Sequence, residues 1–228
     1  MSPKQEILKG KICIVTGANS GIGKYTCIEL AQKGATIVML CRNKEKGEKT
    51  KKEIIDASGN EKVDLMLCDL SKLSDIRQFA ETFKSKYPAL HVLINNAGII
   101  QTKRVMTDDG FESTFAVNYL APFLLSHLLL DKLKSGSPSR IINLTLSYSN
   151  FSLDLDDLQF ENEFSGLVAY GRSKIALNCF THELSEFLKG TNITVNCVYP
   201  GVIKTNIMRN LPGPIRFMSK IFRSPKHG

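Results

Sequence analysis

The stretch of sequence that decides the fold is Thr16-Gly17-Ala18-Asn19-Ser20-Gly21-Ile22-Gly23, which directly follows the apolar run at residues 12–15. The apolar run predicts a buried strand, and residues 24–33 have the pattern of a helix. Glycines between a strand and a helix let the backbone turn sharply and approach a pyrophosphate, whose charge the helix N-terminus favours. Many tight turns contain glycine, but the position between strand and helix is the context that indicates dinucleotide binding.

Outward from this turn, apolar runs alternate with helical patterns along the chain. This order is typical of βαβ units and a parallel sheet. The runs are apolar throughout, which fits strands buried on both faces. We therefore expect one α/β domain over residues 1–228, a Rossmann-type doubly wound parallel sheet with helices on both faces. The predicted strands are 12–15, 36–41, 63–68, 92–94, 140–145 and 193–198, and the predicted helices are 24–33, 44–58, 73–86, 111–133 and 170–189.

The composition is that of a globular protein, with 228 residues, 43% hydrophobic and 23% charged. No apolar run is long enough for a transmembrane helix, and residues 1–6 contain no apolar signal core, so we expect a cytoplasmic protein. The six cysteines form no Cys-x-x-Cys pair, so we expect buried free thiols and no metal site.

The net charge of +8 is concentrated at the C-terminal end. Residues 204–228 include six of the 30 Lys and Arg residues and no Asp or Glu. Between residues 215 and 223 the apolar side chains share one helical face and the cations lie opposite. Two readings stay open for this basic segment: peripheral contact with an intracellular membrane, or packing as a lid over the site. No nucleic-acid-reading helix or aromatic platform is evident, so no nucleic-acid partner is expected.

The end of the second predicted strand indicates which dinucleotide is preferred. An acid that binds the adenosine ribose normally stands there, about 20 residues after the glycine turn. This chain has Arg42 at that point, followed by Lys46. A guanidinium suits a 2′-phosphate by charge and geometry, so NADP(H) is preferred over NAD(H). The alternative is that Arg42 is a solvated loop residue.

Tyr170 and Lys174 are four residues apart and therefore share one face of a helix. A free phenol titrates near about pH 10, too high for a base at neutral pH. A nearby lysine and an oxidised nicotinamide both favour the phenolate, so the pair can relay a proton to a carbonyl oxygen. Such a pair alone is commonplace on helix surfaces.

Further motifs occur in order at the expected elements: Asp69-Leu70, Asn95-Asn96-Ala97-Gly98, Asn118, and Pro200-Gly201 with Thr205. With the glycine turn and the Tyr170/Lys174 pair, they resemble the short-chain dehydrogenase/reductase family. Three stretches are most similar to its retinol dehydrogenase-like branch: Met39-Leu-Cys-Arg42, Asp157-Leu-Gln159 and Phe180-Thr-His-Glu-Leu184. The resemblance covers nearly the whole chain.

The resemblance implies a role for each matching residue. Tyr170 is the acid/base, Lys174 holds the nicotinamide ribose and lowers the pKa of Tyr170, and Asn118 keeps a water relay behind Lys174. The cofactor contacts that it implies, beside Tyr170, Lys174, Arg42 and Lys46, are Gly17, Asn19, Ser20, Gly21, Ile22, Gly23, Asp69, Leu70, Asn96, Ala97, Gly98, Pro200, Gly201, Ile203 and Thr205.

The chain departs from the family pattern where a serine should bind the substrate oxygen. An ungapped match on Asn143 puts Leu146 at that position, and leucine has no hydroxyl. Counting back from Tyr170 points to Thr145, whereas Ser147 lies one residue past the register and can reach in through a bulge. Ser147 is preferred, with Thr145 second and a disabled site as the third alternative.

A second departure concerns the end of the chain. Family members usually continue past this point with another helix and a last strand, whereas this sequence ends at Gly228. We therefore expect a C-terminally truncated member whose last strand is missing, which leaves one sheet edge open unless something else covers it.

The sequence thus predicts an NADP(H)-dependent oxidoreductase that interconverts an alcohol and an aldehyde or ketone on a lipophilic small molecule. The alternative is a nucleotide-binding protein with little or no turnover, because of the altered serine motif and the early end. A homodimer is left open. Apolar candidates for the substrate lining are Leu146, Tyr148, Phe164, Leu167, Leu211 and Phe217.

Overall fold

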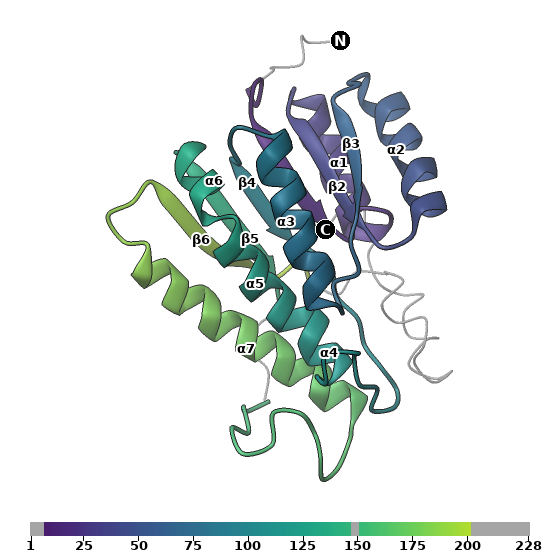
Figure 1. Cartoon of the computed structure of the whole chain (residues 1–228), viewed down its shortest axis with the longest axis vertical. Helices are drawn as coiled ribbons and strands as arrows, with labels where there is room; N and C mark the ends of the chain where they lie inside the picture. The colour runs from purple at the N-terminus through teal and green to yellow at the C-terminus, as the bar shows by residue number, and fades with distance from the viewer. Residues whose placement is uncertain (1–6, 147–150, 202–228) are drawn as a thin grey trace.

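The computed structural model describes residues 7–146 and 151–201 and contains one six-stranded sheet (Figure 1). All five neighbouring pairs of strands are parallel, in the order β3-β2-β1-β4-β5-β6, which confirms the doubly wound prediction. The order reverses between β1 and β4, where ligands bind in open α/β sheets. The strands are β1 (Ile12–Thr16), β2 (Thr36–Cys41), β3 (Val63–Leu67), β4 (Val92–Asn95), β5 (Ser139–Leu144) and β6 (Ile193–Val198).

Helices cover the sheet on both faces and bury two separate apolar clusters. Figure 1 views the sheet from the side of α3, α5 and α7, whose apolar side chains pack with Leu93 and Ile141 of the sheet. On the other face, α1 and α2 pack against Val15 and Met39. The helices are α1 (Gly21–Gln32), α2 (Lys44–Ser58), α3 (Leu73–Lys86), α4 (Ser113–Phe115), the π-helix η1 (Ala116–Leu120), α5 (Ala121–Leu128), α6 (Leu130–Ser135) and α7 (Gly166–Phe187).

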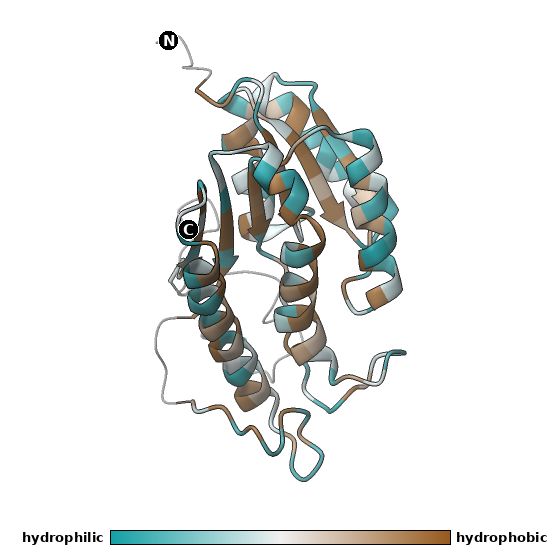
Figure 2. Cartoon of the chain, turned by 60° about the vertical axis from the view of Figure 1, so that its left-hand side comes forward, coloured by the Kyte–Doolittle hydropathy of each residue, from teal (hydrophilic) through white to brown (hydrophobic). Residues whose placement is uncertain are grey.

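The strands are buried in the way that their composition predicts. In β2 every residue after Thr36 is buried, and in β1 every residue after Ile12 is buried. Figure 2 shows the strands coloured as hydrophobic along most of their length, while hydrophilic colour lies on the helices. In the parts of the chain that the structure describes, no helix is long and apolar enough to cross a membrane.

The prediction of one helix over residues 111–133 is wrong. The segment begins at Ser113, widens into the π-helix η1, and is broken again at Leu129, whose ψ of 7° is not helical. Pro122 explains the first irregularity, since its nitrogen cannot donate to the carbonyl of Asn118 one turn earlier. The amide of Ala121 instead donates to the carbonyl of Ala116, five residues back, which is the π-helical bond.

Two helices begin earlier than predicted, and two cysteines are not buried. Helix α1 begins at Gly21 instead of residue 24, and α7 begins at Gly166 instead of Tyr170. Tyr170 therefore lies in the second turn of α7, where the backbone on both sides is helical.

Cys179 and Cys197 are exposed, because they lie on the outer side of α7 and on the edge strand β6.

Candidate functional site

The glycine turn joins β1 to α1 at the carboxyl end of the sheet. Gly17 and Gly21 have φ values of 65° and 54°, which lie in the left-handed region that favours glycine. A Cβ on Gly23 would lie 2.6 Å from the carbonyl oxygen of Gly17, so the turn packs directly on the first helical turn. No acidic side chain stands in the first turn of α1. The helix N-terminus is thus suited to an anion.

The residues directly after the neighbouring strand β4 hydrogen-bond to the start of this turn. The side-chain amide of Asn96 donates to the carbonyl oxygen of Thr16 at 2.7 Å. The hydroxyl oxygen of Thr16 accepts from the backbone amides of Asn96 and Ala97 at 3.0 and 2.9 Å. A Cβ on Gly17 would lie 3.0 Å from the Cα of Ala97, which excludes a larger residue there. These contacts fix the turn at the point where the strand order reverses.

Two cations lie at the end of β2, where the sequence predicts the adenosine phosphate. The Arg42 guanidinium, 76% exposed, lies 3.6 Å from the Asp69 carboxylate that follows β3. Exposed ion pairs contribute little to stability, so Arg42 remains available to a ligand. Lys46 stands exposed in the first turn of α2, where the side chain of Asn43 caps its backbone amide at 2.8 Å. Arg42 and Lys46 favour an anion, while the acid Glu45 in the first turn of α2 opposes one at the N-terminus of that helix.

Tyr170 and Lys174 lie close together on α7, near the carboxyl end of β5. The Lys174 nitrogen is 5.9 Å from the centre of the Tyr170 ring and donates to the carbonyl oxygen of Leu144 at 2.8 Å. Burial lowers the pKa of Lys174 to about 8. Burial, and then the nearby Tyr199, raises the pKa of Tyr170 to about 12. This direction is opposite to the lowering expected from Lys174, because loss of hydration raises the pKa of the phenol.

Asn118 connects the helix after β4 to the helix that contains Tyr170. It lies fully buried in η1, and its side-chain nitrogen donates to the Ser173 hydroxyl and to the carbonyl of Ile99, both at 3.0 Å. The side-chain oxygen accepts from the amide of Ile99 at 2.8 Å. Ser173 in turn donates to the carbonyl of Tyr170 at 2.7 Å. The amide of Asn118 is therefore held in one orientation beside the tyrosine and the lysine.

Of the two candidate hydroxyls, only Thr145 lies within the described residues. It is buried, and its hydroxyl donates to the backbone oxygen of Lys174 at 3.2 Å. The hydroxyl is therefore committed to α7. Leu146 is half-buried next to it. Ser147 lies outside the described residues.

The structure brings most of the predicted residues to the same end of the sheet, since each follows the carboxyl end of a parallel strand. Asn19 and Ser20 lie in the glycine turn, Leu70 follows β3, Gly98 follows β4, and Pro200 and Gly201 follow β6, Gly201 with a φ of 80°. Of the lining candidates, Phe164 is half-buried and Leu167 is 56% exposed. The predictions that lie outside the described residues concern Ile203, Thr205, Tyr148, Leu211, Phe217 and the basic segment 204–228.

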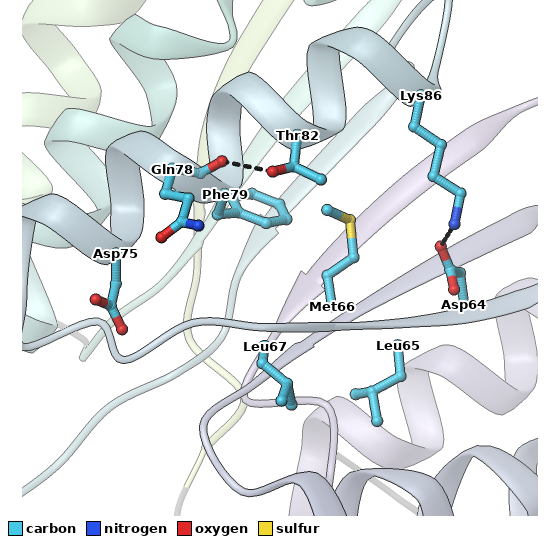
Figure 3. A pocket seen from close by; sticks show the side chains of 9 residues that line it. All are labelled: Asp64, Leu65, Met66, Leu67, Asp75, Gln78, Phe79, Thr82 and Lys86. Carbon is cyan, nitrogen blue, oxygen red and sulfur yellow. Dashed lines mark hydrogen bonds and ion pairs between the residues drawn. The ribbon is translucent and has the colours of Figure 1, made fainter.

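A hollow of about 400 Å³ lies beside the outer strand β3, between this strand and α3 (Figure 3). Asp64, Met66 and Phe79 line it, and Lys86 reaches across to pair with Asp64. None of the residues predicted for the site lines this hollow, so it is separate from the Tyr170 region.

Sequence reasoning assigned no role to three residues that hold the site together: Thr16, Ser173 and Glu112. Ser173 stands directly before Lys174 and Thr16 directly before the glycine turn, so adjacency to a motif was the available signal. Glu112 is a fully buried acid six residues before Asn118, and no sequence pattern distinguishes it from an exposed acid.

The amino-acid sequence is similar to that of known proteins. A family model described as short chain dehydrogenase matches residues 11–214. The chain is 44% identical to human retinol dehydrogenase 13, over 91% of this chain and 63% of that protein. It is 45% identical to human retinol dehydrogenase 11, over 89% of this chain and 64% of that protein. The chain thus spans just under two thirds of the length of these relatives.

Solved structures with the same arrangement include two nucleotide complexes. A metagenomic short-chain oxidoreductase in complex with NADP has a TM-score of 0.71 and 30% identity, over 85% of this chain and 83% of that one. The Pseudomonas aeruginosa RhlG/NADP active-site complex has a TM-score of 0.73 and 26% identity, over 92% of this chain and 79% of that one.

Proposed function

Because this chain belongs to the short-chain dehydrogenase family, we propose that it is an NADP(H)-dependent oxidoreductase that interconverts an alcohol and an aldehyde or ketone. The observation on which the proposal depends is the arrangement of Tyr170, Lys174 and Asn118, in which a buried amine lies under the tyrosine ring. The retinol dehydrogenases to which the chain is similar support a lipophilic substrate. The half-buried Leu146 and Phe164 near the site agree with that choice.

The residues at the glycine turn fit a dinucleotide. Gly17 and Gly21 form the tight turn that precedes α1, and Arg42 and Lys46 supply the positive charge that a 2′-phosphate needs. The NADP complexes of similar fold support this assignment. When bound, NADP(H) supplies or takes up the hydride, and the residues of this chain handle the proton.

Tyr170 is the group that holds and transfers this proton. With a pKa of about 12, its phenol is protonated at neutral pH and ready to donate to a carbonyl oxygen. Lys174, with a pKa of about 8, is largely charged at pH 7 and stabilises the phenolate that remains after the transfer. Asn118 keeps the α7 backbone beside this pair in place through Ser173.

Replacing Tyr170 with phenylalanine tests this role. We expect Tyr170→Phe to bind NADPH within about twofold of the unaltered chain, because the ring still packs, and to lose at least about 100-fold in turnover of a lipophilic aldehyde. Tyr25→Phe, on α1, is the matched control. Turnover that survives in Tyr170→Phe assigns the proton to another residue.

A second candidate, a nucleotide-binding protein with little turnover, is favoured by one observation. The Thr145 hydroxyl is already bonded to Lys174, so it is not free to orient a substrate oxygen. Titration of NADPH binding and assay of NADPH consumption on the same sample separate the two functions. Binding without consumption across a panel of lipophilic aldehydes selects the second.

A further inference from the structure

Gln159 links two segments that are distant in the sequence. Its side-chain oxygen accepts from the backbone amide of Glu112 at 3.0 Å, across 47 residues. Its backbone oxygen accepts from the Arg104 guanidinium at 2.9 Å, across 55 residues. Gln159 lies in the loop that leads from β5 into α7. This loop is therefore fastened to the segment that leads into α4.

Glu112 transmits this contact to the helix that follows. It is fully buried, and its carboxylate accepts from the amides of Thr114 and Phe115 at 2.9 and 2.8 Å, which caps the helix. Its carbonyl accepts from the amide of Ala116 at 2.8 Å. The Glu112 amide has no partner inside the helix, and Gln159 supplies one.

The π-helix η1, which directly follows α4, contains Asn118, six residues after Glu112. Asn118 donates to Ser173 of α7, and Ser173 donates to the carbonyl of Tyr170. The α4–η1 segment is thus bonded at Asn118 to α7 itself and at Glu112 to the loop that precedes α7. Farther along, Tyr119 and Phe123 pack on Phe180 of α7, whereas the start of the segment at Glu112 is held by Gln159.

We propose that Gln159 is a positioning residue, which through Glu112 fixes the start of the segment that contains Asn118 and so the position of Asn118 relative to Tyr170. The inference rests on the proposed function, because it assigns Asn118 and Tyr170 to one reaction. Gln159 acts through the helix start, so its removal affects the order of the site and leaves the glycine turn and Arg42 unaltered.

The first experiment is a double-mutant cycle on turnover. Gln159→Leu removes the accepting oxygen and keeps most of the side-chain volume, and Gln78→Leu on the exposed side of α3 is the matched control. We expect Gln159→Leu to lower kcat about 5- to 10-fold, as loss of one partly buried hydrogen bond predicts, with the NADPH Kd unchanged. Gln159→Glu, which keeps an accepting oxygen, restores most of kcat. In an Asn118→Ala background, the effect of Gln159→Leu on kcat disappears.

The second experiment needs no turnover. The side-chain amide protons of Asn118 exchange with solvent at a rate that NMR measures, and we expect Gln159→Leu to speed their exchange about 10-fold while Gln78→Leu does not. If the unaltered chain lacks turnover, the proposed function fails, and this measurement still tests the positioning. Unchanged exchange at Asn118, or an equal loss of kcat with and without the Asn118 side chain, overturns the inference.

Discussion

The side chain of Lys174 places an amino group in the protein interior, where it donates to the carbonyl of Leu144. Burial lowers its pKa from 10.5 to about 8. That shift corresponds to a penalty of about 3 kcal/mol on the charged form at neutral pH. Such a penalty is typical of residues retained for function and not for stability.

Replacing this lysine should therefore stabilise the fold. We expect Lys174→Met to raise the free energy of unfolding at pH 7 by about 1–2 kcal/mol, less than the full penalty because Leu144 loses its donor. Between pH 8 and 10.5 the unfolded chain binds this proton and the folded chain does not, so the unaltered chain gains stability as the pH rises. The advantage of Lys174→Met thus shrinks over that window. Urea unfolding at pH 7 and 10, with exposed Lys189→Met as the control, tests this, and an equal advantage at both pH values contradicts it.

Arg42 lies 76% exposed at the end of β2, beside Asp69. A guanidinium that bonds a phosphate contributes more than a neutral hydrogen bond. We expect Arg42→Ala to lower the ratio of NADPH to NADH affinity at least about 10-fold, as loss of one charged hydrogen bond predicts. Fluorescence titration of both nucleotides measures the ratio, and Arg77→Ala on α3 is the control. An unchanged ratio removes Arg42 from cofactor selection.

Single substitutions at Thr145 and Ser147 test which hydroxyl supports turnover. Because the Thr145 hydroxyl donates to the Lys174 backbone, we expect Thr145→Val to cost about 1 kcal/mol of stability with at most about a threefold loss of kcat. We expect Ser147→Ala to lower kcat about 100-fold, as loss of a preorganised donor to the substrate oxygen does. Steady-state kinetics on both variants decides between them. A severe loss in Thr145→Val alone reverses the assignment.

The start of the α4–η1–α5 segment depends on one carboxylate. Glu112→Ala leaves the amides of Thr114 and Phe115 buried without acceptors, so we expect it to lower the free energy of unfolding by about 2–4 kcal/mol. Glu48→Ala, on the exposed face of α2, should change it by less than about 0.5 kcal/mol. Urea unfolding compares the two. Similar small effects would mean that water replaces the carboxylate.

The strands could be predicted because the hydrophobicity of their residues indicates directly which positions are buried. Apolar runs located all six strands, and two of them, β2 and β6, to the residue. The same signal failed over residues 111–133, where apolar spacing continues across a π-helix and a break at Leu129. Apolar patterns record which side chains are buried, whereas a change from α to π bonding depends on single backbone donors such as the one that Pro122 lacks.

The site was predictable where a residue type is tied to a chemical task. Glycine, arginine, tyrosine and lysine indicated where the proposed cofactor turn and the proposed acid/base pair lie. The Thr145 bond to Lys174 and the Gln159 bond to Glu112 span 29 and 47 residues. Such contacts depend on how loops meet after folding, and neither periodicity nor spacing encodes them.

The whole molecule should respond to its cofactor as one unit. The glycine turn follows β1 and Asn96 follows β4, and these two strands are neighbours in one continuous sheet. We expect NADPH at 100 times its Kd to raise stability by about 2.7 kcal/mol, and the Tm by about 5–10 °C, in a single transition. NADH at the same concentration should raise Tm less. Calorimetry measures this, and two separate transitions would contradict the single unit.

The central place of β1 in the sheet bears on how the chain is made. Thr16, at the end of β1, is bonded to Asn96, 80 residues later, at the end of β4. A ribosome needs roughly 4 to 16 seconds to add those residues at about 5–20 residues per second. During that interval β1 can pair with β2 on one side, while its other edge has no partner yet. Until β4 is made, the backbone N–H and C=O groups of Cys13, Ile14 and Val15 that face β4 in the finished sheet therefore lack their strand partner.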